Sequence, residues 1–167
     1  MMGADTPQIS VGTWKEGLYI NVHGRATQRV CPTIEQVIND FFSENREKPR
    51  LTIDLFQCAW VDSTFAGWLA GLQKRMSRMN GAELYLAACS ERCRSSLEKM
   101  NLVNMFKFVE EAVPEAVRQV ACPTTDRPDK ATLKLMMEAH RELMGMSDSN
   151  QRIFGPIVSA LQRQMDG

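Results

Sequence analysis

The stretch that decides the fold is Leu51-Thr-Ile-Asp-Leu-Phe-Gln-Cys-Ala-Trp-Val-Asp-Ser-Thr-Phe-Ala-Gly67. Its apolar residues predict a buried strand that ends at Val61, after which Asp62 or Ser63 begins a helix. The first backbone N–H groups of a helix have no internal partners, and together with the helix dipole they favour an anion. The turn therefore suits either a simple helix cap or a phosphorylated Ser63, and these residues alone leave both open.

Composition and charge indicate a globular domain with a proper core and a small appendage. The chain has 167 residues, of which 44% are hydrophobic and 24% are charged, and its formal net charge is zero. This balance argues against nucleic acid or an anionic membrane surface as the main partner. No apolar run approaches the roughly 20 residues of a membrane span, and the N-terminus lacks a secretory signal. We therefore expect a cytoplasmic protein without direct membrane insertion.

The cysteines predict neither a disulfide framework nor a metal site. Five cysteines are scattered along the chain, and the histidines are His23 and His140. Cys89 and Cys93 would share one helix face, but a metal site needs two further ligands nearby. We interpret the cysteines as small buried residues and expect no metal and no cofactor.

Hydrophobic periodicity predicts a hairpin followed by strand–helix units. This order is typical of an α/β fold with a mixed β-sheet of about five strands and helices packed on it. Strands are expected over 8–14, 17–23, 51–56, 83–87 and 106–109, a loop over 24–27, and helices from Pro32 to Pro49, from Ser63 to about Asn80, and after Ser90.

The C-terminal third of the chain has a different character. We expect a domain over residues 1–114, a proline-containing linker over 115–129, and a two-helix extension over 130–167. Both helices carry apolar, methionine-rich stripes, with His140 on one of them as a packed residue. Because isolated helices of this size are marginal in water, the stripes must be covered by the body, by each other or by a second chain. A homodimer through these helices is one such arrangement.

The motif Thr52-Ile-Asp-Leu, five residues, Val61-Asp-Ser-Thr, two residues, Gly67, one residue, Leu69 resembles the signature of the STAS domain. This is the fold of bacterial anti-sigma factor antagonists, and the resemblance covers roughly residues 8–112. It implies that an anti-sigma factor, which is also a serine kinase, phosphorylates Ser63. The unphosphorylated protein would bind that partner and release a sigma factor, and the phosphate would break the complex.

The same resemblance implies a partner-binding surface around the turn. Phe65 either points into the core or enlarges this surface, and Trp60 is either exposed as an interface anchor or packed. Arg25 lies in the loop after the second predicted strand, where family members often carry an acidic residue. The expected partner-binding residues are Asp62, Ser63, Thr64, Phe65, Trp60 and Arg25.

Two other function classes are weighed against this switch. An enzyme is disfavoured because Ser63 has no histidine partner visible in sequence and no phosphate-binding loop motif is present. The alternative is a STAS subunit or scaffold of a larger assembly, such as a lipid-transport ABC system. In that case the same surface would bind constitutively and the helical extension would provide the anchor.

Overall fold

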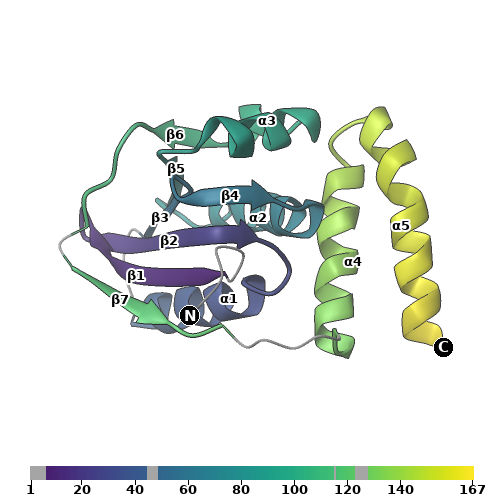
Figure 1. Ribbon diagram of the computed structural model, residues 1–167, viewed down its shortest axis with the longest axis horizontal. Helices are drawn as coiled ribbons and strands as arrows, with labels where there is room; N and C mark the ends of the chain where they lie inside the picture. Colours follow the sequence, from purple (N-terminus) through teal and green to yellow (C-terminus); the bar gives the residue numbers. More distant parts are fainter. Residues whose placement is uncertain (1–6, 45–48, 115, 123–127) are drawn as a thin grey trace.

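A mixed β-sheet forms the centre of the computed structural model, which describes residues 7–44, 49–114, 116–122 and 128–167. β1 and β2 form an antiparallel hairpin, while β3, β5 and β6 continue parallel to β2. Within the described residues the sheet has seven strands in the order β6-β5-β3-β2-β1-β7, with β4 beside the end of β2 (Figure 1). The strands are β1 (Gln8–Trp14), β2 (Gly17–Ala26), β3 (Arg50–Asp54), β4 (Cys58–Val61), β5 (Glu83–Ala87), β6 (Lys107–Val109) and β7 (Val117–Val120).

Helices cover this sheet and extend beyond it. In Figure 1, α4 and α5 stand side by side at the end of the sheet to which β2 and β4 point. The predicted α/β fold with a mixed sheet is confirmed, with more strands than the five expected. The helices are α1 (Cys31–Phe42), α2 (Ser63–Ser77), α3 (Glu91–Lys99), the short 3₁₀ helix η1 (Val103–Met105), α4 (Lys130–Met144) and α5 (Asp148–Asp166).

The decisive stretch forms two strands rather than one. β3 ends at Asp54, whose side chain accepts a hydrogen bond from the Phe56 backbone N–H at 2.9 Å. Such a bond to the backbone two residues ahead is a typical cause of turns at aspartate. The turn exposes Phe56, which has a relative accessibility of 69%, and the chain then re-enters the sheet as β4.

β4 also explains why β2 is longer than expected. The predicted loop over 24–27 is mostly strand, because β2 continues to Ala26 and pairs with β4. The pairing is irregular at Gly24, whose φ of 85° suits glycine. Beyond this irregularity, the β2–β4 pairing places Arg25 opposite Trp60. This extension carries the backbone of β2 to the beginning of α2.

β7 was not anticipated by the sequence pattern. Its residues lie within the segment expected to be a linker, and they pair with β1 in antiparallel register. The strand thereby covers an edge of the sheet that would otherwise expose unpaired backbone groups. Residues 115 and 123–127 of the expected linker lie outside the described residues.

α2 is buried on more than one side. Phe65 and Leu69 are fully buried in the main core, but the residues between them, including Gly67, are buried as well. A helix resting on a sheet alone normally leaves one face in water. The continuous burial from Thr64 to Ala70 follows from a second layer, because α4 packs on the face of α2 that carries Gly67.

Candidate functional site at the N-terminus of α2

Asp62, rather than Ser63, caps α2. Its backbone N–H donates to the Ala26 carbonyl at 3.0 Å, which ties the turn to the end of β2. Its Oδ1 atom accepts the Phe65 N–H at 2.7 Å, the usual role of an N-cap carboxylate. Ser63 is consequently the first residue of the helix, directly beside the capping carboxylate.

The Asp62 carboxylate is partly desolvated. Burial raises its pKa from 3.8 to about 6, while hydrogen bonds from the backbone N–H groups of Phe65, Gln28 and Thr64 act in the opposite direction. The carboxylate thus already accepts hydrogen bonds from the first turn of α2. A second anion placed on Ser63 would lie next to it and would be repelled.

The Ser63 side chain contacts α4. Its Oγ atom lies 2.8 Å from Nε2 of His140, and the other ring nitrogen, Nδ1, lies 2.6 Å from the Met136 carbonyl oxygen. A carbonyl only accepts, so Nδ1 carries the hydrogen and Nε2 of the neutral ring accepts the Ser63 O–H. Burial lowers the pKa of His140, which keeps the ring neutral. The Phe154 ring of α5 packs on the imidazole, with ring centroids 5.7 Å apart.

Backbone packing brings α4 this close. A Cβ atom on Gly67 would lie 2.1 Å from the Ala139 carbonyl oxygen, so this position admits only glycine at the present helix separation. One turn later, a Cβ atom on Gly71 would lie 3.5 Å from Cγ of Glu142, which is ordinary contact. Two glycines four residues apart on one helix face are a pattern by which helices approach closely. This pattern was the available sequence signal for the α2–α4 contact, and the sequence analysis missed it.

The other predicted site residues divide into buried and exposed groups. Thr64 and Phe65 are buried, and Phe65 packs on Trp68 with ring centroids 5.4 Å apart, so Phe65 points into the core. Trp60 is exposed, with a relative accessibility of 45%, and the Arg25 guanidinium lies 5.6 Å from its ring centroid. This geometry allows a cation–π contact on the protein surface.

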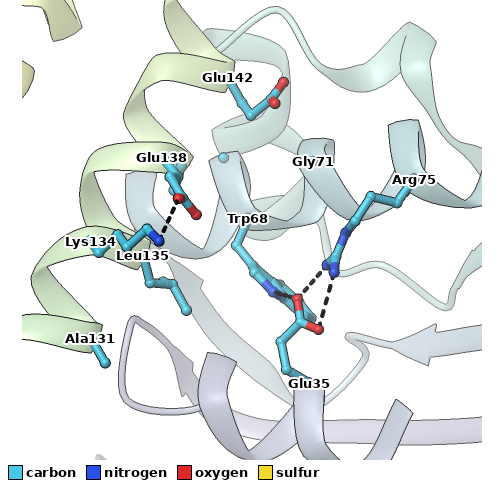
Figure 2. Close-up of a pocket in the computed structure, with 11 residues that line it drawn as sticks. Glu35, Trp68, Gly71, Arg75, Ala131, Lys134, Leu135, Glu138 and Glu142 are labelled. Carbon is cyan, nitrogen blue, oxygen red and sulfur yellow. Dashed lines mark hydrogen bonds and ion pairs between the residues drawn. The ribbon is translucent and has the colours of Figure 1, made fainter. Parts of the chain in front are cut away.

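A groove runs along the α2–α4 contact on the side of α1 (Figure 2). It has a volume of about 560 Å³ and is lined by residues of both signs of charge together with apolar groups. On its floor Trp68 donates to Glu35 at 2.7 Å, and Glu35 also pairs with Arg75. Ser63 does not line this groove.

A second contact holds the turn between α4 and α5. Asn150 is fully buried, and its Nδ2 atom donates to the Met100 and Leu143 carbonyl oxygens, each at 2.9 Å. Its Oδ1 atom accepts from Asn101 at 3.2 Å, and Asn101 has the left-handed φ of 61°. The α4–α5 hairpin is therefore attached along α2, from Ser63 to Lys74, and again after α3.

The fold is that of a STAS-like α/β domain, which confirms the fold that the resemblance implied. An anti-sigma factor antagonist from Mycobacterium paratuberculosis aligns with a TM-score of 0.51 and 18% identity, over 65% of this chain and 89% of that chain. The anti-sigma factor antagonist SpoIIAA in its unphosphorylated form aligns with a TM-score of 0.49 and 15% identity, over 64% of this chain and 90% of that chain. No family model and no curated protein sequence matches the chain.

Among the described residues, no group of three or more His, Cys, Asp or Glu side chains is placed to hold a metal ion. None of the helices in the described ranges is long and apolar enough to cross a membrane.

Proposed function

We propose that the protein is an anti-sigma factor antagonist that binds its partner around Asp62 and Ser63 and is switched by phosphorylation of Ser63. The main support is the position of Ser63. It is the first residue of α2, directly after the cap, in a fold shared with an anti-sigma factor antagonist. The partner would be an anti-sigma factor with serine kinase activity, and Trp60 with Arg25 would extend the contact surface beside it.

The switch has a simple electrostatic basis. Transfer forms a bond between the Ser63 oxygen and the γ-phosphorus of ATP, releases ADP, and displaces the hydroxyl proton to a base. The phosphate adds about −1.5 to −2 charges at pH 7. The Asp62 carboxylate lies in the adjacent position and already accepts the Phe65 N–H. The added charge therefore meets a carboxylate rather than unpaired donors, and a partner that binds the neutral hydroxyl would be repelled.

The test compares three full-length, tagged variants in the producing organism. Ser63→Asp should lower recovery of a GHKL-type kinase with the protein by about tenfold or more, as expected for a charge placed in a contact. Ser63→Ala should retain the kinase and lose the phosphate that mass spectrometry finds on Ser63 in the wild type. Ser149→Asp, the same change at an exposed residue of α5, is the matched control and should alter neither result. Undiminished kinase recovery with Ser63→Asp would refute the switch.

One observation favours the second candidate, a constitutive subunit of a larger assembly such as a lipid-transport ABC system. α5 exposes Ile153 and Ile157, with relative accessibilities of 55% and 38%, on a face that no described element covers. If this face anchors the protein, Ile153→Glu combined with Ile157→Glu should abolish co-purification of a transporter ATPase. The same variant should leave kinase recovery unchanged if the switch operates. Light scattering on both proteins would show whether the face instead joins two copies of this chain.

A further inference from the structure

We infer that α4 is an intramolecular cover for Ser63: the α4–α5 hairpin must leave α2 before any partner or phosphoryl donor can engage the Ser63 hydroxyl. The identity of that partner or phosphoryl donor rests on the proposed function. The cover itself follows from contacts within this chain, so it can be tested without a partner.

The cover occupies the position that a partner would need. The Ser63 hydroxyl is already hydrogen bonded to His140, whose ring is buried beneath Phe154. Four residues further along α2, the Ala139 backbone lies where even a methyl group on Gly67 would collide. No third element fits between the two helices along this line. A phosphoryl group on the Ser63 oxygen would likewise compete with the imidazole for space.

The α4–α5 hairpin has a small apolar cluster of its own. Leu133 and Met137 of α4 pack with Leu161 of α5 in a small cluster that is distinct from the main core. This cluster can keep the two helices together after they leave the body. The hairpin contributes Ala139, Leu143 and Phe154 to the buried main core, and Leu135, Met144 and Met146 pack against that core partly buried.

Beyond the close packing at Gly67, α4 contacts α2 through a partly exposed ion pair and beside an unfilled groove. Lys74 pairs with Glu142 at 2.5 Å, but both side chains are more than one-third exposed, and such pairs contribute little. The groove beside Trp68 leaves part of the contact unfilled. Elements with few buried apolar contacts are those that open locally while the rest of a protein stays folded.

The test measures access to residue 63 in the full-length chain. Ser63→Cys places a thiol at this position, and the rate of its alkylation by iodoacetamide is followed by mass spectrometry of the peptide that contains it. A matched pair of substitutions is then added to this background. Gly67→Ala introduces a methyl group against the Ala139 backbone, whereas Gly71→Ala introduces the same group into ordinary contact.

We expect slow alkylation in the Ser63→Cys background and in its Gly71→Ala derivative. Gly67→Ala should accelerate alkylation at least about tenfold, because overpacking shifts the local opening equilibrium. Equal rates in all three proteins, or a background rate that matches a short unstructured peptide, would overturn the cover. If Gly67→Ala prevents folding, as judged by circular dichroism, Asn150→Ala decides the matter by releasing the other end of the hairpin. Acceleration there supports the cover, and an unchanged rate refutes it.

This outcome is independent of the proposed function. If Ser63→Asp fails to affect kinase recovery while Gly67→Ala exposes residue 63, the cover stands and the switch falls. If kinase recovery responds to Ser63→Asp while alkylation is fast in every variant, the switch stands and the cover falls. If both the switch and the cover hold, phosphorylation of Ser63 in cells should increase in Gly67→Ala and stay at the wild-type level in Gly71→Ala.

Discussion

The Ser63 hydroxyl and the His140 imidazole are 77 residues apart in sequence and share a hydrogen bond of 2.8 Å. The bond joins the turn that carries the STAS-like motif to the helical extension outside the motif. Its direction is fixed by the Met136 carbonyl, which takes the Nδ1 hydrogen and leaves Nε2 as an acceptor. The state of the extension and the chemistry of Ser63 are therefore coupled.

This coupling predicts a measurable interaction energy between the two side chains. Ser63→Ala leaves the buried imidazole without its donor, and His140→Ala removes the ring itself. Each change should lower the free energy of unfolding by about 1–3 kcal/mol, the cost of a lost buried hydrogen bond with its packing. The double variant should be less destabilised than the sum of the two by about 1 kcal/mol. Urea unfolding of the four proteins measures this, and strict additivity would show that the bond contributes nothing.

His140 should also make the folded protein, in which α4 packs on α2, sensitive to acid. Burial lowers the pKa of His140 below its ordinary 6.5, so as the pH falls the unfolded chain takes up a proton before the folded protein does. The stability that the neutral His140 ring contributes is fully present above pH 6.5 and is lost as the pH falls below that value. The groups that face the ring are Ser63, the Met136 carbonyl and Phe154, none of which is charged. His140→Gln, which cannot titrate, should show a shallower loss of unfolding free energy between pH 7 and pH 5.

Asp62 should act in the opposite direction. Its pKa is raised from 3.8 to about 6, so the folded protein takes up this proton first as the pH falls. The buried carboxylate therefore costs stability above about pH 6, and that cost is relieved between pH 6 and pH 3.8. Asp62→Asn keeps an oxygen that can accept the Phe65 N–H and removes the charge. It should raise the unfolding free energy at pH 7 by about 1–3 kcal/mol, with a smaller gain at pH 4.5. A loss of stability at pH 7 would show that the charge is needed for the cap.

The turn and its strand–helix context were predictable because local chemistry determines them. Periodic apolar residues, the Asp62 cap and the Ser90 cap place α2, β5 and α3 close to their observed bounds. The division of the decisive stretch into two strands was not predicted, because it depends on one bond, from the Phe56 backbone N–H to the Asp54 side chain, within a mostly apolar run.

The partner of Ser63 was not predictable from pattern alone. His140 lies on the apolar stripe of its helix, where a packed residue is the usual interpretation, and it is indeed buried. What the stripe does not reveal is which surface it covers. The spacing of Gly67 and Gly71 indicates that another helix packs closely on α2. It does not indicate which helix that is. Long-range packing, rather than local preference, completes the site.

Trp60 provides a test that separates binding from stability. Its ring is 45% exposed and contacts the Arg25 guanidinium, so Trp60→Ala should lower the unfolding free energy by no more than about 1 kcal/mol. Aromatic residues in such positions often dominate an interface, so the same change should weaken the proposed kinase complex about tenfold or more. Calorimetric titration with the kinase, once identified, measures the second effect. Phe56→Ala, at a more exposed ring in the β3–β4 turn, is the comparison variant.

Asn150 controls the other end of the hairpin, and its replacement should loosen α5 without unfolding the sheet. Its amide donates to the Met100 and Leu143 carbonyls. In Asn150→Ala the Met100 carbonyl loses this donor, whereas the Leu143 carbonyl still accepts from the Met146 N–H. Losing these bonds costs about 1–3 kcal/mol, which should appear as faster amide hydrogen exchange in α4 and α5. Exchange in β3 and β5 should stay slow, because the core strands do not depend on this contact. Ser149→Ala, at the exposed neighbouring position, should leave exchange unchanged. Acceleration spread equally over sheet and hairpin would mean that the two form one cooperative unit and that the hairpin cannot open alone.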